Sequence, residues 1–175
     1  MLYLSSMAKK ELVFSGFKAI FSLLLILCIF IPVEVAWAKR PPEIRNQEDL
    51  NISQDMHGQD LREYEFVKFD LRGIDFSGSD LSGAVFNNSN LSKANFNGAD
   101  MHDFLAYASD FENANLSDAN LTNALLMESS FGNSLIEGAD FTDAVISRIQ
   151  QKQLCSIASG TNSRTGVETS YSLGC

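Results

Sequence analysis

Residues 114–123 read Ala-Asn-Leu-Ser-Asp-Ala-Asn-Leu-Thr-Asn, and residues 94–98 read Ala-Asn-Phe-Asn-Gly. Each five-residue unit has a small residue, a large apolar residue two places later, and polar or Gly residues elsewhere. Every fifth position from Leu61 to Ile146 carries a large apolar residue, except Ala106. A period of five fits neither a helix nor a long strand. It fits a short extended segment whose small and large residues point inward, followed by a turn rich in Asn, Asp and Gly.

Stacking such units produces a solenoid whose coils pair about 4.8 Å apart and bury one another. The pattern resembles the pentapeptide repeat family, written A-[DN]-L-x-x, over about half the chain. The resemblance implies an all-β fold, a right-handed quadrilateral β-helix with four units per coil. We expect this β-helix at 60–148, with short helical or irregular caps at its ends.

The place before each large apolar residue is usually Asp or Asn, and its apolar exceptions support a coil of twenty residues. These exceptions are Val85, Leu105, Leu125, Leu135 and Val145. Four of them are spaced by twenty and would stack on one outer face. With the neighbouring aromatic and thioether side chains they predict an interaction face: Val85, Leu105, Tyr107, Leu125, Met127 and Val145. The alternative is that a terminal segment folds over this face.

A second outer face is predicted to be acidic, with Asp60, Asp80, Asp100 and Asp140 in register. Like charges about 4.8 Å apart repel each other. Binding of a cation or of a basic partner would relieve the repulsion. The alternative is a solvated acidic face that maintains solubility.

The twenty-residue register also predicts how the core is filled. It places Phe66 over Phe86 and stacks other aromatic pairs in the same way. Ala106 lacks the bulk of its position, but Phe104, two places earlier, replaces a small residue. We therefore expect the Phe104 side chain to fill the core volume that Ala106 leaves empty.

Residues 1–38 have the features of a secretory signal peptide. Lysines precede an apolar run from Ala19 to Val33, and Ala36-Trp37-Ala38 forms a small-residue cleavage pattern. The run has about fifteen apolar residues, fewer than a membrane span needs, although an uncleaved anchor is the alternative. We expect export, no stable membrane insertion after cleavage, and an N-terminal cap segment at 39–59.

Two cysteines follow the leader, Cys155 and Cys175, and an even number in an exported protein predicts a disulfide. Two free thiols are the alternative. The Cys-bracketed segment at 149–175 resembles the C-terminal end of thylakoid lumen pentapeptide proteins of cyanobacteria and plants. The resemblance implies a location in the thylakoid lumen, or else in the periplasm, and carries no catalytic residues to this chain.

Composition and motifs favour a binding protein over an enzyme. The net charge of −9 argues against nucleic-acid binding, and no nucleophile, metal-ligand or phosphate-loop pattern is found. We predict no catalytic residue, metal or cofactor, and an unknown protein partner or self-association, with a role near photosynthetic complexes. The alternative is an acidic DNA mimic that acts on a nucleic-acid-binding protein such as gyrase, as some members of the family do.

Overall fold

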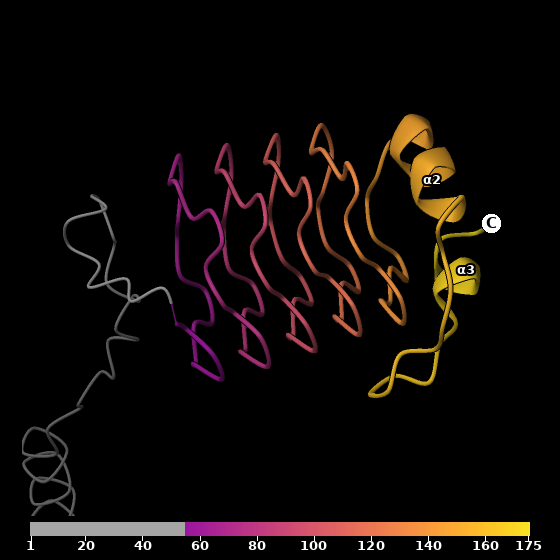
Figure 1. The fold of residues 1–175 in the computed structure, drawn as a ribbon, viewed down its shortest axis with the longest axis horizontal. Helices are drawn as coiled ribbons and strands as arrows, with labels where there is room; N and C mark the ends of the chain where they lie inside the picture. The colour runs from indigo at the N-terminus through magenta and orange to yellow at the C-terminus, as the bar shows by residue number, and fades with distance from the viewer. Residues whose placement is uncertain (1–54) are drawn as a thin grey trace, which may run out of the picture. The chain divides into compact units, whose positions relative to one another are not determined.

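The computed structural model describes residues 55–175, and Figure 1 shows them as a stack of coils followed by two short helices. The predicted signal peptide and most of the N-terminal cap segment lie outside the described residues. Every parallel bridge joins residues twenty positions apart, beginning with Asp55 and Asp75. The coil therefore begins at least five residues before the predicted boundary at 60. Met56 is half-buried and Gly58 has the turn conformation of the later repeats, so these residues continue the pattern.

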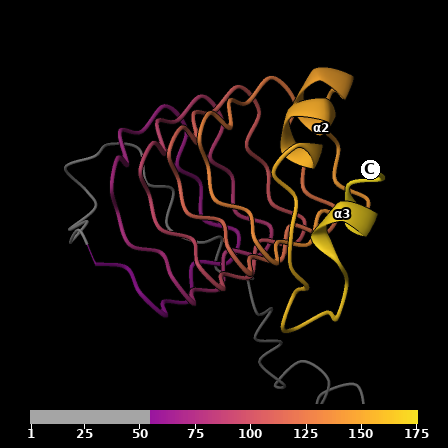
Figure 2. The same ribbon diagram turned by 45° about the vertical axis from the view of Figure 1, so that its right-hand side comes forward.

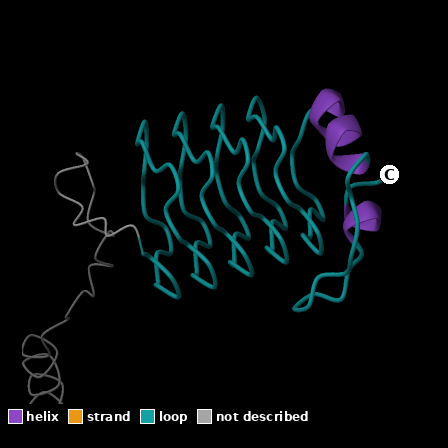
Figure 3. Cartoon of the chain, viewed as in Figure 1, coloured by secondary structure: helices purple, strands orange, loops and turns teal. Residues whose placement is uncertain are grey.

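Four ladders of single bridges run along the coil, one on each side. Figure 3 shows the coils as loops because each pairing is one residue long and builds no continuous strand in the described residues. Backbone hydrogen bonds link adjacent coils, as from Leu61 N to Asp80 O at 2.8 Å and from Asp80 N to Gln59 O at 2.9 Å. The twenty-residue register expected from the sequence is the register of these ladders. Their members are Asp55, Asp75, Asn95, Asn115 and Leu135; Asp60, Asp80, Asp100, Asn120 and Asp140; Glu65, Val85, Leu105, Leu125 and Val145; Asp70, Asn90, Asp110 and Ser130.

A turn with one left-handed residue separates successive ladder positions. The residue two places after each inward apolar side chain has a positive φ in all eighteen turns from Gly58 to Asp143. Gly, Asn and Asp hold thirteen of these places, because they adopt this conformation at the lowest cost. The turn polarity seen in the sequence is thus a backbone requirement as well as a solubility feature.

The inward side chains form columns along the coil. The ring centroids of Phe76 and Phe96 lie 5.2 Å apart with an interplanar angle of 10°, and those of Phe66 and Phe86 lie 4.4 Å apart. The predicted aromatic stacking is confirmed at both places. Phe104 is fully buried, and its ring lies 5.0 Å from Phe86 beside the equally buried Ala106. Phe104 therefore fills the core volume that Ala106 leaves empty, as the sequence predicts.

A column of inward serines adds hydrogen bonds to this core. Ser89 Oγ donates to Phe66 O at 2.5 Å and accepts from Phe69 N at 3.0 Å. Ser109 repeats the arrangement one coil later, where its Oγ donates to Phe86 O at 2.5 Å. Buried hydroxyls are satisfied in this way without interrupting the backbone ladders.

Helix α2, Arg148–Cys155, covers the C-terminal end of the coil, and α3 is Thr169–Ser172 (Figure 2). Ser147 and Gln150 form a capping box at the start of α2. The buried Gln150 Nε2 donates to Leu126 O and Ser129 O, both at 2.8 Å. In the preceding coils the carbonyls equivalent to Leu126 O accept from serine hydroxyls. Gln150 therefore supplies the donor that a further coil would provide.

Replacing Gln150 with leucine should lower the free energy of unfolding by about 1–3 kcal/mol. The change leaves Ser129 O without its donor and removes half of the capping box. Urea denaturation followed by circular dichroism measures the effect. Gln153→Leu, at an exposed position of the same helix, is the matched control and should change the midpoint little. Equal effects of the two substitutions would contradict the capping role.

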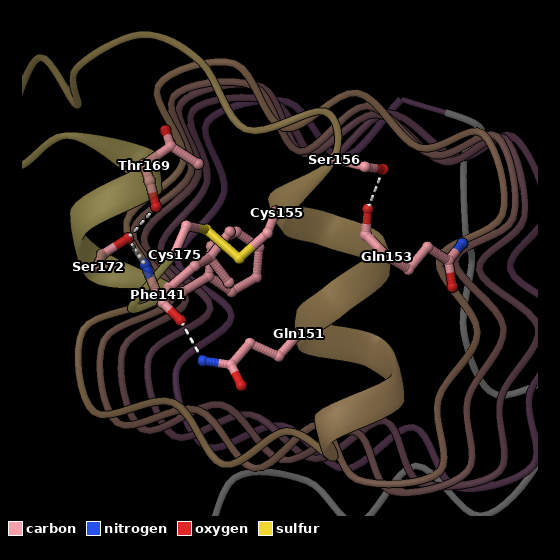
Figure 4. The surroundings of a disulfide bond; sticks show 9 residues. Phe141, Gln151, Gln153, Cys155, Ser156, Thr169, Ser172 and Cys175 are labelled. Atoms are coloured by element: carbon pink, nitrogen blue, oxygen red, sulfur yellow. Dashed lines mark hydrogen bonds between the residues drawn. A yellow bond between two sulfur atoms is a disulfide. The ribbon is translucent and has the colours of Figure 1, made fainter.

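The segment after α2 is held to the coil by a disulfide and by polar contacts. Cys155 is bonded to Cys175, with their Cα atoms 5.6 Å apart, which ties α2 to the last residue of the chain (Figure 4). Asn162 is buried, and its Nδ2 donates to Gly138 O at 2.9 Å. Gly160 has a φ of +79°, and a Cβ there would lie 2.8 Å from Gly138 N, so only glycine fits.

Reduction of the disulfide should loosen residues 156–175 and leave the coil intact. The crosslink stabilises the folded state by roughly 3 kcal/mol in the chain-entropy model, but the coil buries its own Phe and Leu columns. We expect faster amide exchange after Ser156 and little change in the β signal of circular dichroism. Complete unfolding under mild reduction would show that the coil depends on the crosslink.

Candidate interaction face

The predicted interaction face lies on one side of the coil, where Val85, Leu105, Leu125 and Val145 form a single ladder. Their neighbours along the chain, such as Ala84 and Phe86, are fully buried, so the ladder side chains alternate outward. Val85 and Leu105 are half-buried. The exposed fractions are 45% for Tyr107, 44% for Leu125, 44% for Met127 and 41% for Val145. We call these six residues the apolar face.

The C-terminal segment contacts a different side of the coil. Asn162 donates to Asp118 O and Gly138 O, and Arg164 reaches Asp100 and Gly98. Those residues belong to the acidic ladder and to the corner that precedes it in the chain. The sequence leaves open that one of the terminal segments folds over the apolar face. The C-terminal segment does not cover it. The N-terminal segment before Asp55 lies outside the described residues.

Tyr107 and Glu128 interact at the edge of the apolar face. The Glu128 carboxylate accepts a hydrogen bond from the Tyr107 hydroxyl, and this bond raises the pKa of Tyr107 above its ordinary value. Asn87 Oδ1 accepts from Tyr107 N at 2.8 Å. These contacts hold the Tyr107 backbone and ring at the rim of the apolar ladder.

The predicted acidic face is a ladder, but its charges already have partners within the chain. Arg62 lies 2.7 Å from Asp60 and 3.6 Å from Asp80, and Arg164 lies 2.5 Å from Asp100. Asn120 separates two of the carboxylates, since its Nδ2 donates to Asp100 Oδ1 at 3.0 Å. The like-charge repulsion expected from the sequence is therefore reduced by residues that the repeat pattern does not reveal.

Two carboxylates of this ladder differ in what surrounds them. Burial raises the pKa of Asp100, but the hydrogen bond with His102 and the charge of Arg164 outweigh it, and the pKa falls below its ordinary value. Asp140 is buried and accepts from Thr142 N at 2.9 Å and from Thr142 Oγ1 at 2.6 Å. Both side chains serve the coil itself. Residues 55–175 contain no group of three or more His, Cys, Asp or Glu placed to hold a metal ion.

The two histidines do not form a catalytic arrangement with their neighbours. His57 Nδ1 lies 2.9 Å from Ser77 Oγ, but that hydroxyl also donates to Asp75 at 2.6 Å. The carboxylate thus orients the serine and not the histidine, contrary to the order of a Ser-His-Asp triad. His102 Nδ1 lies 2.9 Å from Asp100.

A groove that the sequence did not predict lies between the last coil and the segment that includes α2. Its volume is about 490 Å³, and Leu135, Ile136, Gln153 and Ile157 contribute to its lining. Among residues 55–175 no helix is long and apolar enough to cross a bilayer.

A family model described as "Pentapeptide repeats" matches eight copies, at residues 70–104 and 107–143. No curated protein sequence matches the chain. A pentapeptide repeat protein from the Arabidopsis thaliana thylakoid lumen is 34% identical over 69% of this chain and 90% of its own, with a TM-score of 0.28. HetL, involved in heterocyst differentiation regulation in the cyanobacterium Nostoc, is 26% identical over 51% of this chain and 41% of its own, with a TM-score of 0.34. QnrB1, a plasmid-mediated fluoroquinolone resistance protein, is 16% identical over 58% of this chain and 64% of its own, with a TM-score of 0.27.

Proposed function

We propose that this chain, which belongs to the pentapeptide repeat family, is an exported protein that binds another protein through its apolar face. Pentapeptide repeat proteins form right-handed quadrilateral β-helices and are generally non-enzymatic structural or interaction proteins. The observation that carries the proposal is the row of exposed apolar side chains on one ladder. A contiguous apolar patch on a soluble protein usually marks an interface.

The coil gives this face two properties that favour binding. Its backbone is fixed by hydrogen bonds to the coils on either side, as from Leu105 N to Ala84 O at 2.9 Å and from Ala106 N to Leu125 O at 2.9 Å. A partner therefore loses little free energy in ordering the surface it contacts. Covering the exposed apolar area contributes about 25 cal/mol for each Å² removed from water.

We place this interaction in the thylakoid lumen, or in the periplasm, and suggest a supporting role for a photosynthetic complex. The support is the signal-peptide pattern of residues 1–38 and the Cys-bracketed C-terminal segment. A disulfide is kept in oxidising compartments and is rare in the cytosol. Detection of the protein in a lumenal fraction tests the location.

A second candidate, the acidic DNA mimic, is favoured by the net charge of −9 and by the ladder of aspartates. Binding to a gyrase-like protein would depend on those aspartates and not on the apolar face. The two functions are therefore distinguished by which face, when altered, loses the partner.

The test is an affinity pull-down from thylakoid lumen and membrane fractions with the protein as bait. Leu105→Asp combined with Leu125→Asp should lose the captured partner. The matched control adds the same two charges at exposed apolar positions elsewhere, Leu135→Asp with Tyr171→Asp, and should retain it. Loss in both variants, or in neither, would refute the assignment of binding to the apolar face.

A further inference from the structure

A row of carboxylates runs beside the apolar ladder. Asp103 and Asp143 lie two residues before Leu105 and Val145, and Glu63 lies two residues before Glu65, which pairs with Val85 at the start of the same ladder. All three occupy left-handed turn positions, with φ of 60° for Glu63, 56° for Asp103 and 57° for Asp143. The corner is stacked in register, since Glu63 N donates to Ser82 O at 3.0 Å and Asp103 N to Thr122 O at 2.9 Å. All three side chains are exposed. We call them the acidic rim.

Asp103 and Asp143 form no ion pair within residues 55–175, whereas Glu63 lies near enough to Arg62 for its charge to act on the guanidinium. The ion pairs of residues 55–175 join Arg62, Arg72, Arg164 and His102 to the aspartates of other ladders. None of them includes a rim carboxylate. The opposite edge of the apolar ladder is different, because it carries Val67, Tyr107 and Met127. The apolar ladder is therefore flanked on one edge by the acidic rim and on the other by apolar side chains, with Glu128 hydrogen-bonded to Tyr107.

We propose that the occupant of the apolar face is a cationic amphipathic helix of a partner protein. Its apolar side packs on the ladder from Val85 to Val145, and its Lys or Arg side chains pair with the acidic rim. This inference rests on the proposed function and adds the chemistry of the partner.

The spacing of both rows fits a helix aligned with the axis of the coil. Ladder side chains repeat about every 4.8 Å, close to the distance that separates neighbouring turns of a helix. Rim carboxylates occur on alternate coils, about 9.6 Å apart. Seven residues of a helix advance about 10.5 Å, so basic residues at i and i+7 meet successive rim carboxylates within about 1 Å.

Charge excludes the other occupants that an apolar face suggests. A second copy carries the same rim carboxylates and the same net charge of −9, so self-association brings like charges together. Anionic lipid surfaces and nucleic acids are repelled for the same reason. A cationic partner gains from the rim, which also steers its approach.

The test uses a fluorescein-labelled eighteen-residue peptide of Leu and Lys whose leucines form one helical face. Fluorescence anisotropy measures its Kd for the purified protein at low and high salt. Glu63→Gln, Asp103→Asn and Asp143→Asn together should raise the Kd about tenfold and weaken its salt dependence, because three charge pairs are lost. Asn and Gln keep the size of the side chains, and Asn tolerates the left-handed turn.

The matched control neutralises three exposed carboxylates on other parts of the surface, Glu112→Gln, Glu137→Gln and Glu168→Gln. It should keep the affinity of the unaltered protein, and a peptide with the same composition in scrambled order should bind more weakly. Equal losses in the two triple variants would mean that net charge alone sets binding, and the inference would be overturned. Failure of the unaltered protein to bind the helical peptide would overturn it as well.

The uncharged variant Leu105→Ser with Leu125→Ser separates this inference from the proposed function. If it loses the peptide while the rim variant keeps it, the apolar face is a binding surface and the acidic rim has no part in recognition. If it keeps the peptide while the rim variant loses it, the apolar face does not bind, and both proposals fail.

Discussion

Replacing Phe104 with alanine is expected to lower the free energy of unfolding by about 3–5 kcal/mol. Phe104 is fully buried, and its ring lies 5.0 Å from Phe86 and 6.5 Å from Phe111. The coil is fixed above and below this layer by backbone hydrogen bonds, so it closes poorly around a lost ring. Urea denaturation of the variant and the unaltered protein measures the difference.

A second substitution shows whether Phe104 and Ala106 share one core layer. Ala106→Leu alone should destabilise by about 1–3 kcal/mol, because it overfills a complete layer. In the Phe104→Ala background the same leucine should recover part of the lost stability, since it restores the ordinary repeat. The sign of its effect therefore reverses. A double variant no more stable than Phe104→Ala alone would show that the two positions do not exchange volume.

The sequence predicts the coil well because the information is local and repeated. In each five-residue unit, the residue types indicate which side chain is large, which is small and which residue tolerates the turn. The stacking of Phe76 on Phe96 follows from the period alone. The apolar exceptions add the register, since Leu105 and Leu125 pair as their spacing requires. The sequence also predicts how the small Ala106 is compensated, because the large Phe104 lies only two residues away.

The remaining features depend on single contacts between distant residues. Gln150 donates to the carbonyl of Leu126, whose equivalents in the preceding coils accept from serine hydroxyls. The sequence around Gln150 indicates only that a helix begins there. Arg164 pairs with Asp100 across 64 positions, and Asn162 reaches Gly138 from a segment without period. The repeat indicates that an inward residue such as Ser109 is small but does not say that its hydroxyl bonds to Phe86 O. No periodic signal marks contacts that occur once.

The acidic rim shows the same limit in the candidate site. The sequence predicts the apolar face and the four aspartates of the acidic ladder. It does not show that Asp60 and Asp100 are compensated by arginines while Asp103 and Asp143 have no ion-pair partner among residues 55–175. Residues alike in the repeat thus differ in function through contacts that the fold alone provides.

Leu105→Asp combined with Leu125→Asp should abolish binding of the partner protein while changing the melting temperature of this protein little. The two side chains point outward, and their ladder is held by backbone atoms that the substitutions leave unchanged. The main cost to the fold is repulsion between two carboxylates about 4.8 Å apart, which amounts to roughly 1 kcal/mol in water. Calorimetry and a binding assay on the same preparations measure both quantities.

The pair of results assigns the apolar face to one of three states. Lost association at a nearly unchanged melting temperature identifies an exposed binding surface. A melting temperature lowered by many degrees means that the substitutions bury charges, so a segment preceding Asp55 covers the face, as the sequence allows. Unchanged association together with an unchanged melting temperature removes the residue-level support for the proposed function, because the exposed leucines would then contribute neither to folding nor to binding.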